Sequence, residues 1–368
     1  MLIYLGQYSY GARVVSFACS EDAKSSLSRS HLSYCYNEGS KLHFVPEGFS
    51  IDLGESALQK ISQCNDFDIW MIYENGVMNR VYDNGSNENA FMLTGRCNSN
   101  CIMCPAPDYQ RKKDGMSLKD NLEIVRRIPD TTEHITITGG EPFLFGPAIF
   151  EILSEMKERL PNTQFQLLTN GRALSYRSFL EHFVSSCPAN MIVGIPLHGY
   201  DNETHDFITR SPGGFRQTKE GIRNLLRNRL SVELRLVVSK LNCKYITKIA
   251  ELIVNEFPGT SRVEIMGLEM MGNALKNKEN VWLSYPDAFN ASRDAIDLLS
   301  KNGISVGLYN FPLCSMPAKY HFIAKRSITG YKVCFPSGCD GCTLQDACGG
   351  FFNSSLKFSE QDIKPVKK

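Results

Sequence analysis

The sequence has almost no net charge, because 40 lysines and arginines stand against 39 aspartates and glutamates in 368 residues. This balance argues against a protein that grips nucleic acid through its phosphates. No apolar run approaches the roughly 18 to 20 residues that cross a bilayer. The start, Met-Leu-Ile-Tyr, lacks the basic residues and the small-residue cleavage site of a signal peptide. We therefore expect a cytoplasmic protein with no membrane or nucleic-acid partner.

Cysteine, in contrast, is abundant, with 13 residues. A reducing compartment keeps thiols free, so we do not expect a disulfide framework. Three cysteines gather at 97–104 and five at 314–348, which is typical of metal sites. The others are scattered and are expected to be small buried hydrophobes: Cys19, Cys35, Cys64, Cys187 and Cys243.

The first group, Cys97, Cys101 and Cys104, has the spacing C-x3-C-x2-C and directly follows the apolar run 89–94. Three thiolates on one loop can hold three irons of a cubane cluster and leave the fourth iron open. An open position allows chemistry, as in other catalytic metal sites. We predict that these cysteines are catalytic cluster ligands. A structural zinc site or a role in the core is the alternative.

A second motif follows one strand later. The β-branched run 135–138 leads directly into Gly139, Gly140, Glu141 and Pro142. Glycines allow close approach to the backbone, the glutamate supplies an acceptor, and the proline stiffens the turn. Together with the cysteine triplet, this GGEP motif resembles the radical S-adenosylmethionine (SAM) superfamily. The resemblance implies a [4Fe-4S] cluster on three cysteines and a SAM amino group bound at GGEP.

Strand-like and helix-like segments alternate from residue 89 to about 310, which predicts an α/β fold with a parallel sheet. Six units suggest a partial (β/α)6 barrel, whose functional groups gather at the carboxyl ends of the strands. The cysteine loop, GGEP and the turn at Asn170 follow the first three strands and should therefore share one face. The expected strands are 89–95, 134–138, 164–169, 191–196, 232–238 and 262–267. The expected helices are 117–127, 147–160, 176–184, 215–230, 244–257 and 286–302.

We expect four regions in the chain. Residues 1–88 form a small β-rich domain without alternating helices, in which Trp70 and Tyr73 belong to the core. Residues 89–303 form the barrel, and 304–358 form a cysteine-rich extension. The polar end, 359–368, is expected to be a flexible tail.

The extension holds a second candidate metal site. Cys339, Cys342 and Cys348 have the spacing C-x2-C-x5-C, and two glycines follow. This pattern resembles the SPASM and twitch extensions of peptide-modifying radical SAM enzymes, although the last cysteine of the full SPASM pattern is missing. We expect one auxiliary [4Fe-4S] cluster, and a four-cysteine zinc site is the alternative. The expected ligands are Cys314, Cys339, Cys342 and Cys348, with Cys334 as the substitute.

The superfamily resemblance also implies cofactor contacts outside the two motifs. Met103 and Gly267 would lie near adenine, and Asn170 near the cofactor at the third strand. His198 lies in a segment that helps to hold ribose or carboxylate in many members, although Pro196 here replaces a serine. Arg210 or Arg235 could pair with the cofactor carboxylate. For both arginines a structural ion pair, and for His198 a hydrogen-bonded structural role, remain open.

Several segments together look like the HxsC-type maturases of the His-Xaa-Ser system: 94–105, 266–269, 309–314 and 348–352. This resemblance implies a radical SAM enzyme that modifies a ribosomally made peptide. Its partners would be a precursor peptide or protein with His-Xaa-Ser repeats, a second radical SAM maturase and an electron donor. One alternative is a small-molecule enzyme resembling the molybdenum-cofactor cyclase. The other is a non-catalytic, metal-stabilised binding module.

Overall fold

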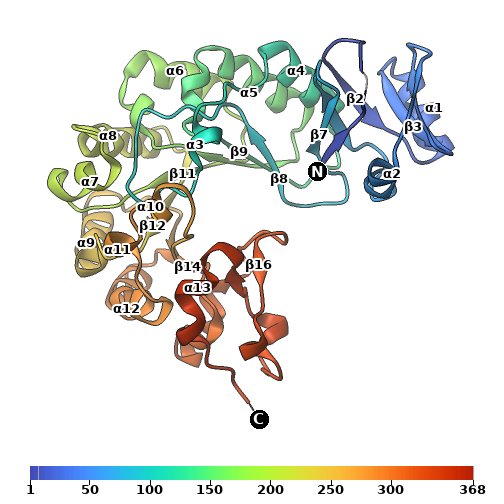
Figure 1. Cartoon of the computed structure of the whole chain (residues 1–368). Coiled ribbons are helices and arrows are strands. Elements are labelled where there is room, and N and C mark those ends of the chain that lie inside the picture. The colour runs from blue at the N-terminus through green and yellow to red at the C-terminus, as the bar shows by residue number, and fades with distance from the viewer. Residues whose placement is uncertain (7, 368) are drawn as a thin grey trace.

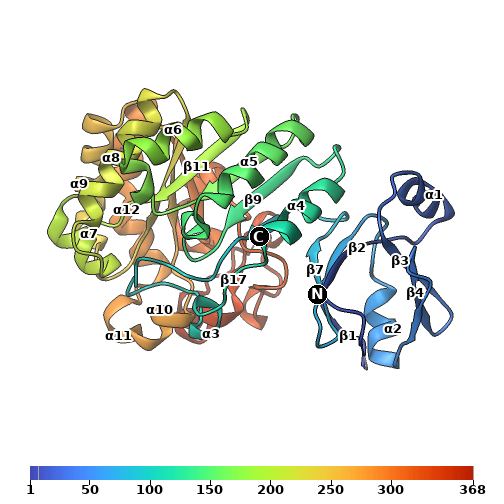
Figure 2. The ribbon, with the colours of Figure 1, turned by 90° about the horizontal axis from the view of Figure 1, so that it is seen from above.

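The computed structural model describes residues 1–6 and 8–367. It contains an N-terminal domain, a central curved sheet covered by helices, and a C-terminal segment (Figure 1). The N-terminal domain and the C-terminal segment flank the central part on different sides, as the view from above also shows (Figure 2). None of the helices in these two ranges is long and apolar enough to cross a membrane.

The central sheet is parallel and has eight strands in the order β15-β14-β13-β12-β11-β10-β9-β8. The six predicted strands are confirmed, and the sheet continues beyond them through two strands that the sequence did not suggest. Because β8 and β15 do not pair with each other, the barrel is partial. The strands are β8 (Asn89–Met92), β9 (His134–Thr138), β10 (Gln164–Leu168), β11 (Met191–Pro196), β12 (Ser231–Val237), β13 (Arg262–Met266), β14 (Ser305–Tyr309) and β15 (Ala324–Lys325).

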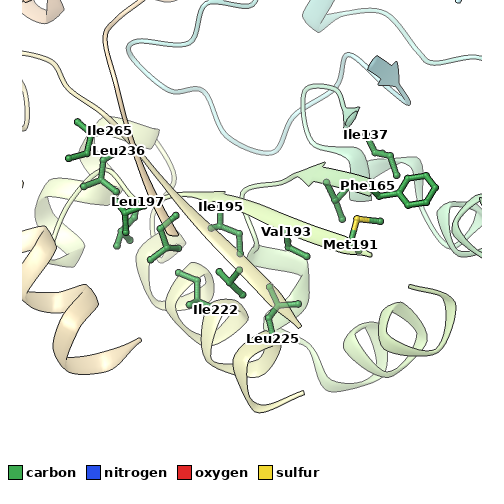
Figure 3. Packing of buried hydrophobic residues seen from close by; sticks show 14 of the residues in the cluster. Ile137, Phe165, Met191, Val193, Ile195, Leu197, Ile222, Leu225, Leu236 and Ile265 are labelled. Atoms are coloured by element: carbon green, nitrogen blue, oxygen red, sulfur yellow. The ribbon is translucent and has the colours of Figure 1, made fainter. Parts of the chain in front are cut away.

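Helices cover the outer face of this sheet. Ile222 and Leu225 of α8 pack against strand residues such as Val193 and Ile195 (Figure 3). Alternate strand positions are apolar and buried, which fixes the face that each strand turns toward the helices. The helices are α3 (Asp108–Arg111), α4 (Leu118–Arg127), α5 (Ala148–Arg159), α6 (Arg177–Ser186), α7 (Asn202–Thr209), α8 (Gly214–Arg227), α9 (Ile246–Glu256), α10 (Gly272–Lys276), α11 (Lys278–Val281) and α12 (Tyr285–Lys301).

The N-terminal domain is a mixed sheet in the order β1-β7-β6-β2-β3-β4-β5. It also contains two helices, which the sequence prediction missed. Trp70 is fully buried as expected, whereas Tyr73 is 36% exposed and does not belong to the core. The elements are β1 (Leu2–Tyr4), β2 (Arg13–Phe17), α1 (Glu21–Arg29), β3 (Tyr34–Glu38), β4 (Lys41–Val45), β5 (Ser50–Asp52), α2 (Glu55–Ile61), β6 (Ile69–Ile72) and β7 (Val77–Tyr82).

One face of this domain packs on the barrel. Val14 and Met71 belong to the same apolar cluster as the barrel core. Buried Arg127 of α4 reinforces the contact, because it donates to the carbonyl of Ser33 at 2.6 Å while it pairs with Glu123. The N-terminal domain is thus a fixed neighbour of the barrel edge.

The C-terminal segment is short in regular structure and contains β16 (Val333–Cys334), β17 (Phe351–Phe352) and α13 (Leu356–Ser359). Residues 359–367, which the sequence predicts to be a flexible tail, contact the rest of the chain. Asp362 is buried, Ile363 packs against the main core, and Val366 accepts a backbone hydrogen bond from Thr343 at 2.9 Å. Ile363 and this backbone hydrogen bond hold the end of the chain against the protein. The last residue of the predicted tail, 368, lies outside the described part.

Three of the five scattered cysteines are buried as expected. All 13 are free thiols. Cys35, Cys64 and Cys187 are buried, as predicted for small hydrophobes, and Cys243 is half-buried. Cys19 is exposed, so the prediction is wrong there.

Candidate active site

The first cysteine group lies on the loop that leaves β8. Within this loop the Cys104 amide donates to the carbonyl of Cys101 at 3.2 Å, so the chain makes a tight turn between these two cysteines. Burial raises the pKa of Cys101 to about 12, with Cys104 and Cys97 adding to the effect. Burial also raises the pKa of Cys97, against a hydrogen bond from the Ser99 amide to its Sγ at 3.4 Å. The raised pKa values of Cys97 and Cys101 keep both thiols protonated near pH 7 until a metal replaces the proton.

Hydrogen bonds from two helices fix the shape of this loop. At the end of α7, the Ile102 amide donates to the carbonyl of Ile208 at 2.9 Å. From α10, the Asn273 side chain donates to the carbonyl of Cys101 at 3.0 Å, and the Asn273 amide donates to the carbonyl of Cys104 at 2.9 Å. The backbone around the thiols is therefore held from both sides, which is what a pre-organised metal site requires.

The two glycines of GGEP lie directly against the cysteine loop. The Gly140 amide donates to the carbonyl of Thr94 at 2.8 Å. A Cβ at Gly140 would lie only 2.3 Å from the carbonyl oxygens of Gly95 and Arg96, and one at Gly139 would lie 2.4 Å from that of Thr94. Only glycine allows this approach. The motif therefore positions the cysteine loop, in addition to any contact with a ligand.

Glu141 joins GGEP to the next strand. Its carboxylate is buried and accepts from the Thr169 hydroxyl at 2.7 Å, the Asn170 amide at 2.7 Å and the Phe143 amide at 3.1 Å. Burial raises the pKa of Glu141, and the three hydrogen bonds oppose that shift. Both oxygens thus have partners within the protein, so this side chain braces two loops.

Two residues that sequence reasoning missed complete the brace. Asn98, inside the cysteine loop, accepts at its side-chain oxygen from the Asn170 amide group at 2.7 Å. Arg172 donates to the carbonyl of Asn98 at 2.9 Å and to the Gln217 side chain at 2.7 Å. The structure therefore brings the cysteine loop, GGEP and the Asn170 turn together at one end of the sheet. The only signal for Arg172 in the sequence was its position just after the Asn170 turn.

Three other predicted cofactor residues are buried within the protein. Met103 is buried in an apolar cluster with Ile208 and Leu268. A Cβ at Gly267 would lie 2.6 Å from the carbonyl oxygen of Asn310, so close packing explains this glycine. His198 is buried, and burial lowers its pKa to about 3, which keeps it neutral near pH 7.

The two arginines lie in different surroundings. Arg210 is exposed at the end of α7, with a left-handed φ of 50°, and lines a separate pocket beside Ile102. Arg235 lies inside the barrel and donates to Glu233 at 2.7 Å. Arg235 therefore forms a structural ion pair, which was one of the two roles left open for it by the sequence.

Charged groups line the inner face of the sheet near Arg235. Glu233 is fully buried and also accepts from Arg262 at 2.7 Å. Burial raises the pKa of Glu264 to about 7, with the neighbouring Glu233 charge adding to the shift. Sequence reasoning missed this cluster, although charges at alternate positions of two apolar strands mark one polar face.

The second cysteine group surrounds a cavity. The cavity measures about 340 Å³, including the part open to solvent. Burial raises the pKa of Cys339 to about 11, with the three other lining thiols adding to the shift, whereas burial alone raises that of Cys334. The amides of Leu313 and Gly350 donate to Cys348 Sγ at 3.3 and 3.4 Å. The thiols that line the cavity are Cys314, Cys339, Cys342 and Cys348.

Within residues 1–6 and 8–367, no three His, Cys, Asp or Glu side chains converge closely enough to hold a single metal ion. In a cubane cluster each cysteine binds a different iron. Neither cysteine group therefore needs thiols that converge on one point in order to bind such a cluster. Three thiols on one loop and four around one cavity are donor sets that fit such clusters.

A model of the radical SAM superfamily matches residues 91–253, from β8 into α9. This part of the chain belongs to the radical SAM superfamily. An AdoMet-dependent heme synthase from Methanosarcina barkeri is 30% identical over 165 residues, which are 44% of this chain and 46% of that protein. The sporulation killing factor maturation protein SkfB from Bacillus subtilis is 26% identical over 164 residues, 44% of this chain and 38% of that protein. The chain thus spans less than half the length of these relatives.

Among solved structures, SuiB from Streptococcus suis, bound to its precursor peptide SuiA, has a TM-score of 0.50. Its sequence identity is 14%, and the match covers 60% of this chain and 48% of that one. This likeness concerns the fold, and it agrees with the parallel-strand sheet described above.

Proposed function

We propose that the chain is a radical SAM enzyme that modifies a ribosomally made peptide. The observation that carries this proposal is the cysteine loop, with three free thiols, seated by hydrogen bonds on the GGEP turn. When bound and reduced by an electron donor, a [4Fe-4S] cluster with an open iron would supply the electron for cleavage of SAM to methionine and a 5′-deoxyadenosyl radical, which would abstract hydrogen from the substrate.

The protein's own part in this reaction is to hold and orient. Cys97, Cys101 and Cys104 would each bind one iron. The Glu141 amide, through the carbonyl of Arg96, and Arg172, through that of Asn98, keep the cysteine loop against the ends of β9 and β10. Such fixed geometry is the usual contribution of a protein whose cofactor performs the difficult step.

A peptide substrate is supported by two of the similar proteins. SkfB is a maturation protein by its name, and the SuiB structure contains a precursor peptide. The HxsC-like segments favour a substrate with His-Xaa-Ser repeats, together with a second maturase and an electron donor. In the same proposal, the cavity lined by Cys314, Cys339, Cys342 and Cys348 holds one auxiliary cluster.

The test is the release of 5′-deoxyadenosine from SAM by the anaerobically reconstituted protein under reductant. A variant in which Cys97, Cys101 and Cys104 are all changed to alanine should release none. The control is Cys243→Ala, which removes a half-buried thiol outside both groups and should retain release. Undiminished release by the triple variant would exclude the proposed cluster site.

The heme synthase relative favours a second candidate, a radical SAM enzyme that acts on a small molecule. For this candidate, the resemblance to the molybdenum-cofactor cyclase suggests a nucleotide as the substrate. Mass spectrometry separates the two candidates. A mass change in a co-expressed His-Xaa-Ser precursor supports the peptide, whereas turnover of free GTP without any change in the precursor supports the small molecule.

A further inference from the structure

The barrel sheet ends at β8, which pairs with β9 on one side only. The Leu93 amide donates to the carbonyl of Thr138 at 3.0 Å, so the odd-numbered residues of this strand turn their backbone groups toward β9. Backbone groups alternate in direction along a strand. Those of Ala90 and Met92 therefore point to the free edge, where an unpaired row is a template for another strand.

A groove of about 820 Å³, including the part open to solvent, runs along this free edge. Ala90, Phe91 and Met92 form one side of it, β7 of the N-terminal domain a second side, and the loop 113–116 a third. About 270 Å³ of it is open to water, just below the range of about 300 to 1,000 Å³ that is typical of ligand sites. The groove thus exposes strand backbone and has room for a short extended chain.

The end of the groove at Thr94 and Gly95 reaches the candidate active site. Thr94 and Gly95 line it, and Thr94 is the residue whose carbonyl accepts from the amide of Gly140. The Gly95 amide donates to the carbonyl of Lys113, which closes this end. A chain lying along β8 would therefore arrive at the backbone that positions GGEP and the cysteine loop.

The chemistry of the groove favours a peptide. Two apolar or aromatic side chains stand open at its walls, Met92 at 40% and Tyr73 at 36% exposure. Two of its charges already have partners: Arg80 lies 3.0 Å from Asp68, and Asp114 lies 3.1 Å from Arg96. The groove offers exposed backbone and apolar surface, and most of its charges are paired. These features suit a peptide bound through main-chain hydrogen bonds better than an anionic nucleotide.

We propose that an extended segment of the substrate peptide docks in this groove as an added strand beside β8. This inference rests on the proposed function, because it requires a peptide substrate. Ala90 and Met92 would each exchange main-chain hydrogen bonds with the peptide, and Tyr73 and Met92 would contact its side chains.

The experiment compares Ala90→Pro with Ala90→Val in the reconstituted full-length protein with SAM. Proline removes the outward amide, and edge strands tolerate proline where that amide is not used by the fold. Valine adds bulk but keeps the amide. Binding of a fluorescein-labelled synthetic peptide with four His-Gly-Ser repeats, measured by anisotropy, should weaken at least fivefold in Ala90→Pro and less than twofold in Ala90→Val. Release of 5′-deoxyadenosine without peptide should be the same in both.

Hydrogen exchange of the wild type gives an independent readout that needs no variant. The amides of Ala90 and Met92 should exchange at least tenfold more slowly when the peptide is bound. Unchanged exchange, or equal loss of affinity in both variants, would overturn strand addition while 5′-deoxyadenosine release leaves the proposed enzyme intact. Failure of the wild type to bind the peptide would overturn the peptide substrate, and this inference with it.

Discussion

At the scale of single residues, the site depends on side chains that brace as much as on those that bind. The cysteines and GGEP could be recognised from the sequence because their spacing is local. Arg172 and Asn98 could not, since their contact joins two loops that are far apart in the chain. Glu141 shows the same limit, because its motif was evident but its three partners within the protein were not.

Arg172→Lys tests this brace. Lysine keeps the charge but cannot make the forked contacts with Asn98 and Gln217 together. We expect an unchanged iron content and a fall in 5′-deoxyadenosine release of about 10- to 100-fold, because small misplacements of reacting groups cost that much. Arg177→Lys, at an exposed arginine of α6, is the control. Equal release in both variants would contradict the positioning role.

Glu264→Gln tests the charge cluster inside the barrel. Because the pKa of Glu264 is raised from 4.5 to about 7, the folded chain holds a proton that the unfolded chain releases between these values. The stabilisation from this proton is complete below pH 4.5 and is lost as the pH rises through 7. Glutamine does not titrate.

From pH 4.5 to 8, the free energy of unfolding of the wild type should therefore fall by roughly 3 kcal/mol relative to the variant. Urea unfolding at both pH values measures this difference. Glu158→Gln, on the exposed side of α5, should follow the wild type. Parallel behaviour of the wild type and Glu264→Gln would contradict the raised pKa.

At the scale of elements, the sequence predicts those with a strong hydrophobic period. The six barrel strands carry buried β-branched and aliphatic residues at alternate positions, so they were found nearly to the residue. Helix α1 was missed because only Ala23 and Leu27 are buried in a polar stretch. Strand β14 was missed because Gly307 weakens its strand pattern. This glycine is required by packing, since a Cβ there would lie 2.0 Å from Glu264 Oε2.

The C-terminal cysteine segment gives a prediction at this scale. Four thiols line its cavity and Cys334 does not. Cys334→Ser should keep about eight irons per chain after reconstitution, the content of two cubane clusters, whereas Cys339→Ser should keep about four. Iron and sulfide analysis measures both. Loss of iron in Cys334→Ser but not in Cys339→Ser would contradict the assigned ligand set, and zinc in place of iron would contradict the cluster.

At the scale of the whole molecule, a partial barrel carries the site, and the N-terminal domain lies beside its free edge (Figure 2). The sequence indicated both parts but not their contact. That contact depends on Arg127 and on one apolar face of the small sheet, which periodicity alone cannot pair with a partner surface. The resulting groove along β8 could therefore not have been predicted from the sequence.

The central claim is that Cys97, Cys101 and Cys104 hold a cubane whose fourth iron is free for SAM. Electron–nuclear double resonance on the reduced protein, with SAM labelled by ¹⁵N in its amino group and ¹⁷O in its carboxylate, tests it directly. We predict hyperfine coupling of both labels to the reduced cluster, and no coupling in the triple alanine variant. A wild-type cluster signal with saturating labelled SAM and no coupling would contradict the claim.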